Sequence, residues 1–102
     1  MKRALLAVML TAMLGRITFQ DHQETYYNLN MNRIVERAAE NGIKGEYWER
    51  ADGCKMLGTK IIVACDWNVY PYGTEVETSR GTGIVLDTGE FTGRIVDLAV
   101  TW

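Results

Sequence analysis

The sequence predicts a small, mainly β domain with one helix. Short runs of β-branched, aliphatic or alternating residues recur between residues 25 and 101, and turn signals separate them. Only residues 30–42 space their apolar side chains as a helix does. The chain has 102 residues, of which 47% are hydrophobic and 24% charged, which suits one modest globular domain. Five or six short strands favour a closed or nearly closed barrel, because closure removes exposed strand edges.

The N-terminus has the pattern of a secretory signal. Met1-Lys2-Arg3 is a short positive region, and an apolar run of eleven residues follows from Ala4 to Leu14. That run is too short to cross a bilayer, which takes about 20 apolar residues. An uncleaved anchor and an amphipathic helix of the domain are the alternatives. We therefore expect residues 1–15 to be a signal sequence or membrane anchor, and the protein to be secreted or held at the cell surface.

A polar linker and then the folded domain are expected to follow. Residues 16–24 are mostly polar, which indicates a linker in which His22 is solvated. The domain then spans residues 25–102, with the helix 30–42 inserted in it. Asn30 is expected to cap this helix and Gly42 to take the left-handed position after it. The apolar stripe that packs on the domain consists of Met31, Ile34, Val35, Ala38 and Ala39.

The body of the domain is predicted to contain six short strands. The most apolar run, Lys60–Cys65, should be a central strand, because a strand buried on both faces is continuously hydrophobic. The other five are expected at residues 25–27, 46–49, 74–78, 84–86 and 95–101.

Composition argues against several functions. A net charge of −2 and the lack of a basic cluster beyond the first three residues give no reason to expect nucleic acid as a partner. No glycine-rich phosphate loop, His/Cys cluster or metal-ligand spacing is present, so we expect no cofactor and no metal. We also expect a monomer. Cys54 and Cys65 either form a disulfide, if the chain is exported, or remain reduced and half-buried.

Three aspartates carry the functional signal of the sequence. Asp66, Asp87 and Asp97 each follow a short aliphatic run, where a strand should end. Carboxylates at strand ends can project into one cleft while the apolar runs build the core beneath them. The alternative is that they cap turns through local backbone hydrogen bonds, and Asp66, with Asn68 two residues later, fits that role best.

The motifs around these aspartates resemble the 3D domain, a family named for three aspartates. They are A-C-D-W-N-V-Y-P-Y-G-T-E-V at 64–76, G-I-V-L-D-T-G at 83–89 and R-I-V-D-L at 94–98, and the match covers residues 26–102 in order and spacing. The resemblance implies a six-stranded, RlpA-like double-psi β-barrel. Lytic transglycosylase A and small Gram-positive stationary-phase transglycosylases have this barrel.

The resemblance also implies an activity. Such enzymes cleave the β-1,4 bond between N-acetylmuramic acid and N-acetylglucosamine in peptidoglycan without water, which leaves a 1,6-anhydro sugar. The expected partner is thus the peptidoglycan glycan strand, and membrane contact would come only through the N-terminal segment. Alternatives are a non-catalytic glycan-binding module and a glycoside hydrolase on the same barrel.

Residue roles carry over from the motifs. Asp97 matches the catalytic aspartate, and Asp87 and Asp66 match the other two. One carboxyl group that first donates and then accepts a proton needs a raised pKa, which neighbouring carboxylates and burial provide. Substrate contacts are expected from Thr88, Gly89, Trp67 and Arg94.

The loop before the last strand departs from the family pattern. Glu90 replaces the second glycine of the family, and Arg94 is expected to take the place of its lysine.

Overall fold

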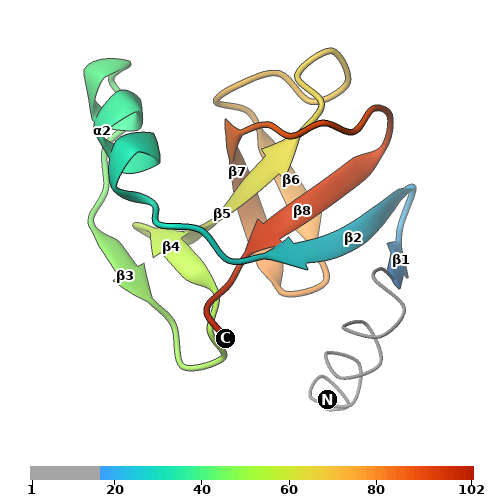
Figure 1. The fold of residues 1–102 in the computed structure, drawn as a ribbon, viewed down its shortest axis with the longest axis horizontal. Helices are drawn as coiled ribbons and strands as arrows, with labels where there is room; N and C mark the ends of the chain where they lie inside the picture. The colour runs from blue at the N-terminus through green and yellow to red at the C-terminus, as the bar shows by residue number, and fades with distance from the viewer. Residues whose placement is uncertain (1–16) are drawn as a thin grey trace.

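Strand β5, Lys60–Cys65, lies at the centre of the sheet in the computed structural model, which describes residues 17–102 (Figure 1). It pairs in parallel with β7 on one side, and on the other its first half pairs with β4 and its second half with β8. Its side chains from residue 61 to residue 65 are all buried. The predicted central strand is confirmed with its bounds, because burial on both faces makes its sequence continuously apolar.

Eight strands and one helix make up the described residues, so the domain is mainly β as predicted. In chain order the strands are β1 (Ile17–Phe19), β2 (His22–Tyr27), β3 (Tyr47–Glu49), β4 (Lys55–Leu57), β5, β6 (Glu75–Thr78), β7 (Gly81–Asp87) and β8 (Ile95–Ala99). The hydrogen-bonded order is β1-β2-β8-β5-β4-β3. Outside this path, β7 pairs with β5 and β6 pairs with β7. Two of the pairings, β2 with β8 and β5 with β7, are parallel.

The sheet formed by residues 17–102 is not closed, which corrects the expectation of a closed barrel. Its path ends at β1 and β3, and β6 pairs with β7 alone. Two strands beyond the six that we expected, β1 and β4, are three residues long each. Such short strands leave too little periodicity for recognition from the sequence.

The predicted linker at residues 16–24 contributes β1 and the start of β2 instead, joined as an antiparallel hairpin. His22 is 3% exposed, so the expectation that it is solvated was wrong. Its Nε2 lies 3.1 Å from Oε2 of Glu24, which is itself fully buried and accepts hydrogen bonds from the backbone N–H and the hydroxyl of Ser79. These polar residues are buried because they satisfy one another.

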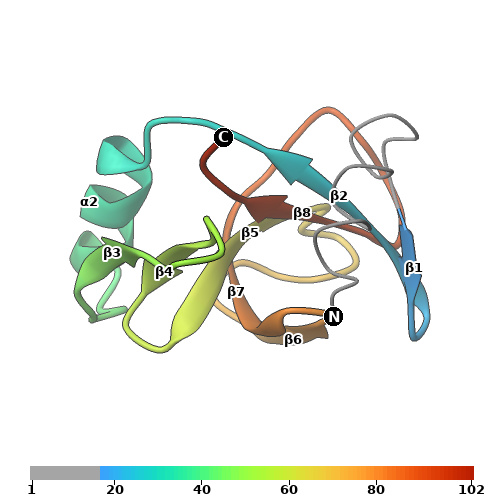
Figure 2. The ribbon, with the colours of Figure 1, turned by 90° about the horizontal axis from the view of Figure 1, so that it is seen from below.

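Helix α2, Asn32–Glu40, is shorter than the expected range of 30–42, and its N-cap is Met31 and not the predicted Asn30. Oδ1 of Asn30 accepts the backbone N–H of Asn32 at 2.8 Å, and Gly42 has a φ of 81°. The predicted stripe faces the domain except for Ala39, which is exposed. Figures 1 and 2 show α2 at one end of the molecule and the β1–β2 hairpin at the other.

Two apolar clusters fill the two faces of the sheet. One consists of Cys54, Met56, Ile61, Val63, Cys65, Val85, Val96, Leu98 and Val100. The other packs against α2 and consists of Met31, Ile34, Ala38, Leu57, Ile62, Ile84, Leu86 and Ala99. The clusters fix which way each strand faces, and therefore which side chains lie next to one another at the strand ends.

The disulfide that we considered between Cys54 and Cys65 is not formed. Both are free thiols, buried in the first apolar cluster. Burial raises the pKa of Cys54 to about 11 and that of Cys65 to about 12, so both thiols stay protonated at neutral pH.

The expected signal sequence or anchor, residues 1–15, lies outside the described residues. Within residues 17–102, no helix has the length and apolar character needed to cross a membrane.

Candidate functional site

Asp87 and Asp97 lie in one row across the sheet. Asp87 on β7 is paired with Ala64 on β5, Ala64 with Asp97 on β8, and Asp97 with Thr25 on β2. Residues in register on neighbouring strands project to the same face, and two strand spacings separate the two aspartates by about 10 Å between Cα atoms. The small side chain of Ala64 between them leaves the carboxylates on a common surface.

Asp97, like Asp87, is half-buried. Its Oδ1 accepts a hydrogen bond of 2.8 Å from the hydroxyl of Thr25. Burial raises the pKa of Asp97; the Thr25 hydrogen bond opposes this rise and the negative charge of Asp87 adds to it. A raised pKa is what a carboxyl group needs in order to act as an acid near neutral pH.

Asp87 is held by donors on both carboxylate oxygens. Its Oδ2 accepts the hydroxyl of Tyr27 at 3.0 Å, and its Oδ1 accepts the backbone N–H of Thr88 at 2.8 Å. Burial raises the pKa of Tyr27 strongly, and the nearby charges of Asp87 and Asp97 add to the effect. The phenol of Tyr27 therefore remains a hydrogen-bond donor at any ordinary pH.

Asp66, the third predicted site aspartate, has a different environment. Its Oδ2 accepts the backbone N–H of Gly93 and its Oδ1 that of Asn68, both at 3.0 Å. These two bonds, with that of Gly93 the larger effect, lower the pKa of Asp66. Asp66 thus ties the turn after β5 to the loop before β8, as the turn-capping alternative predicts. The structure brings Asp87 and Asp97 together and gives Asp66 a supporting position.

Trp67 and Gly89 flank Asp87. The indole Nε1 of Trp67 donates to the backbone carbonyl of Asp87 at 3.0 Å, while the side chain remains 36% exposed and meets Tyr72 edge-on. Thr88 is exposed beside Gly89, and a Cβ on Gly89 would lie 2.6 Å from Cε2 of Phe91. An exposed aromatic ring and backbone groups next to a carboxylate form a surface on which a sugar can stack.

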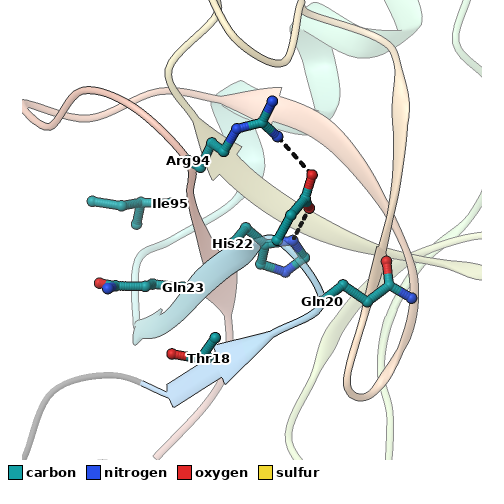
Figure 3. A pocket seen from close by; sticks show the side chains of 7 residues that line it. Thr18, Gln20, His22, Gln23, Arg94 and Ile95 are labelled. Atoms are coloured by element: carbon teal, nitrogen blue, oxygen red, sulfur yellow. Dashed lines mark hydrogen bonds and ion pairs between the residues drawn. The ribbon is translucent and has the colours of Figure 1, made fainter.

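Arg94 is placed away from the two aspartates. Its Nη1 donates to Oδ2 of Asp21 at 2.7 Å, at the edge of a pocket of about 480 Å³ (Figure 3). Figure 3 shows Thr18, Gln23 and Ile95 projecting to one side of this pocket. The side chain of Arg94, which we predicted to contact the substrate, therefore lies beside the β1–β2 turn and not next to Asp97.

Sequence reasoning missed two side chains of the site, Thr25 and Tyr27. The strand at residues 25–27 was predicted, and its alternation places these two on one face. The sequence does not reveal that β2 pairs with β8. In the folded sheet Thr25 meets Asp97, 72 residues away, and Tyr27 meets Asp87, 60 residues away.

The site offers proton chemistry beside an exposed aromatic ring. No cluster of three or more potential metal ligands occurs within residues 17–102. A carboxyl group with a raised pKa, a second carboxylate beside it and an exposed tryptophan can protonate a glycosidic oxygen and bind the sugar that carries it. Comparisons with protein-family models, curated proteins and solved structures return no match to this chain.

Proposed function

We propose that this protein is a peptidoglycan lytic transglycosylase in which Asp97 is the single acid and base. The observation that carries the proposal is the half-buried carboxyl group of Asp97, with its raised pKa, in register with Asp87 across Ala64. The exposed Trp67 beside Asp87 supports a carbohydrate substrate. The spacing of the three aspartate motifs supports peptidoglycan as the source of that carbohydrate.

The reaction needs only one proton to be moved out and back. Protonated Asp97 gives its proton to the glycosidic oxygen, and the bond from that oxygen to C1 of N-acetylmuramic acid breaks. The C6 hydroxyl oxygen of the same sugar then bonds to C1, and the Asp97 carboxylate takes up the hydroxyl proton. Asp97 ends as it began, water is not consumed, and the product carries a 1,6-anhydro ring.

The proposal includes the fold and location that the resemblance implies. We propose a double-psi β-barrel in an open form, supported by the parallel pairings of β2 with β8 and of β5 with β7, which join strands that are not consecutive in the sequence. We also propose that residues 1–15 direct the chain to the cell wall, where the substrate is.

Product analysis tests the function. Purified peptidoglycan is incubated with wild type or with Asp97→Asn, and the released muropeptides are identified by mass spectrometry. Anhydro-muropeptides from wild type alone are the expected result. Reducing-end products would instead make the protein a hydrolase. No release from either, with both proteins folded and still bound to sedimented peptidoglycan, would make it a glycan-binding module.

A further inference from the structure

Trp67 and Tyr72 form an angled pair of rings beside Asp87, which we call the aromatic corner. Their ring centroids lie 5.2 Å apart, and the two ring planes meet at 71°. The indole Nε1 of Trp67 donates to the backbone carbonyl of Asp87 at 3.0 Å, which fixes the ring while leaving its side chain partly exposed. Two rings at this angle give a sugar one flat face to stack on and a second ring to rest against.

The aromatic corner lies on the same side of the sheet as the two aspartates. Tyr72 and Tyr27 pack against the same apolar cluster, the one that contacts α2, and the Tyr27 hydroxyl reaches Asp87. Asp97 shares this face, because it comes two residues before Ala99, which belongs to that cluster. A glycan strand with one of its bonds at Asp97 can therefore continue past Asp87 to the aromatic corner.

The loop that carries Tyr72 is held by hydrogen bonds of its own backbone. The backbone N–H of Gly73 donates to the carbonyl of Val85 at 2.7 Å, and the hydroxyl of Thr74 donates to the carbonyl of Pro71 at 2.6 Å. A surface that is already fixed before binding loses little conformational freedom when a ligand arrives. The aromatic corner is therefore preorganised for a rigid ring.

Asn41, the residue that follows helix α2, adds an amide group to the aromatic corner. Its exposed side chain donates from Nδ2 to the hydroxyl oxygen of Tyr72 at 3.2 Å. Within residues 17–102, no other side-chain hydrogen bond involves Asn41 or the Tyr72 hydroxyl. The Tyr72 hydroxyl can thus donate outward while Oδ1 of Asn41 accepts. This donor and this acceptor match the carbonyl and the N–H of an acetamido group.

We propose that Asn41 and Tyr72 make the aromatic corner a subsite for a 2-acetamido sugar of the glycan strand, beyond the bond that is cleaved. The inference rests on the proposed function and adds to it two residues that select the sugar. The aromatic rings bind the apolar face of any β-1,4-linked sugar of the glucose type. The hydrogen bonds of Asn41 and Tyr72 select those sugars that carry the acetamido group, as both sugars of peptidoglycan do.

The binding of two soluble tetramers tests this without relying on cleavage. One probe is the β-1,4-linked tetramer of N-acetylglucosamine, and the other is the β-1,4-linked tetramer of glucose, which lacks acetamido groups. In ¹⁵N NMR titrations of wild type, the first probe should shift the Trp67 indole and the Asn41 side-chain signals. It should also bind about tenfold more tightly than the glucose tetramer, as the hydrogen bonds to one acetamido group predict.

Three variants separate the selecting residues from the rings. Asn41→Ala should bring the two affinities together, because it removes the acceptor and the group that orients the Tyr72 hydroxyl. Trp67→Ala should weaken the binding of both tetramers by about tenfold, because it removes the stacking surface. Trp48→Ala is the matched control and should change neither affinity. The Trp48 indole also donates to a backbone carbonyl, that of Gly58 at 2.7 Å, and its side chain is 43% exposed on β3.

Equal affinity of wild type for the two tetramers would overturn the inference, and so would binding of neither; these results need no variant to fold. A preference for the N-acetylglucosamine tetramer that survives in Asn41→Ala would overturn it as well. If the preference is found and is lost in Asn41→Ala, but wild type releases no anhydro-muropeptides from peptidoglycan, the transglycosylase proposal fails and the acetamido subsite stands.

Discussion

The buried carboxylate of Glu24 is expected to be worth several kcal/mol to the fold. Glu24 is fully buried on β2, one residue before Thr25, on the face opposite Asp97. It accepts the Ser79 hydroxyl at 2.6 Å, the Ser79 backbone N–H at 2.8 Å and the His22 ring at 3.1 Å. Truncation by Glu24→Ala removes the acceptor for all three donors.

The cost follows from which donors can find water. Ser79 is exposed, so its hydroxyl can turn to solvent, whereas His22 is 3% exposed and loses its buried carboxylate partner. An unsatisfied buried donor costs about 1–3 kcal/mol, and each of the two lost hydrogen bonds from Ser79 contributes about 1 kcal/mol. We therefore expect Glu24→Ala to lower the free energy of unfolding by about 3 kcal/mol. That is a large part of the roughly 5–15 kcal/mol typical of a domain.

Glu24→Gln should cost much less, about 1 kcal/mol. The amide keeps one acceptor oxygen for the Ser79 N–H, and its NH₂ group can donate to the Ser79 hydroxyl or to the other tautomer of His22. Urea denaturation followed by circular dichroism at pH 7 measures both variants.

The control is Glu77→Ala. Glu77 is an exposed glutamate on β6 that accepts the Thr82 hydroxyl at 2.7 Å, and removing it should change stability by no more than about 0.5 kcal/mol. A Glu24→Ala protein as stable as the Glu77→Ala protein would refute the reasoning, because burial and three hydrogen bonds would then contribute nothing.

Two further predictions concern the site and the central strand. Asp97→Asn should stabilise the domain at pH 7 and not at pH 3, as urea titrations at both pH values would measure. A carboxyl group with a raised pKa in the folded state contributes stability below its unfolded pKa, and this is lost as the pH rises through the folded value. If the Asp97→Asn variant were less stable than wild type at pH 7, that result would contradict the burial of this charge. Gly83→Ala should lower the free energy of unfolding by about 1–3 kcal/mol, because the new Cβ would lie 2.9 Å from Cγ1 of Val63. Thermal unfolding measures this change. An unchanged melting temperature would mean that β5 and β7 do not pack as closely as described.

The sequence could predict elements whose own residues specify them. Residues 61–65 are continuously apolar, and the strand Lys60–Cys65 was placed correctly at the centre of the sheet. Helix α2 was indicated by its apolar stripe and by Gly42 after its end. The β1–β2 hairpin was missed because its polar residues are buried through a partner, Ser79, that lies 55 residues from Glu24. β4 was missed for a similar reason: Lys55 is buried because its Nζ reaches Asn28 and Leu29.

The same distinction explains the candidate site. We expected Asp87 and Asp97 at strand ends, but only Asp87 ends its strand, and Asp97 lies in the middle of β8. The register of three strands places the two aspartates on one surface. The roles of Asp66, Thr25 and Tyr27 depend on contacts across the sheet or between loops, such as that of Asp66 with Gly93. No local pattern encodes such contacts. Sheet closure likewise depends on which edges meet, and alternation within a strand does not specify that.

The most direct test of the central claim compares the same chemical change at two of the three aspartates. Initial rates of anhydro-muropeptide release are measured for wild type, Asp97→Asn and Asp66→Asn, with folding checked by NMR. Asp97→Asn should lose at least about a hundredfold in rate, since it removes the proton donor and acceptor. Asp66→Asn keeps an acceptor oxygen for one of its two backbone partners and, where the fold is intact, should retain most of the rate. Loss in Asp66→Asn with a normal fold, or full activity in Asp97→Asn, would contradict the assignment of the acid to Asp97.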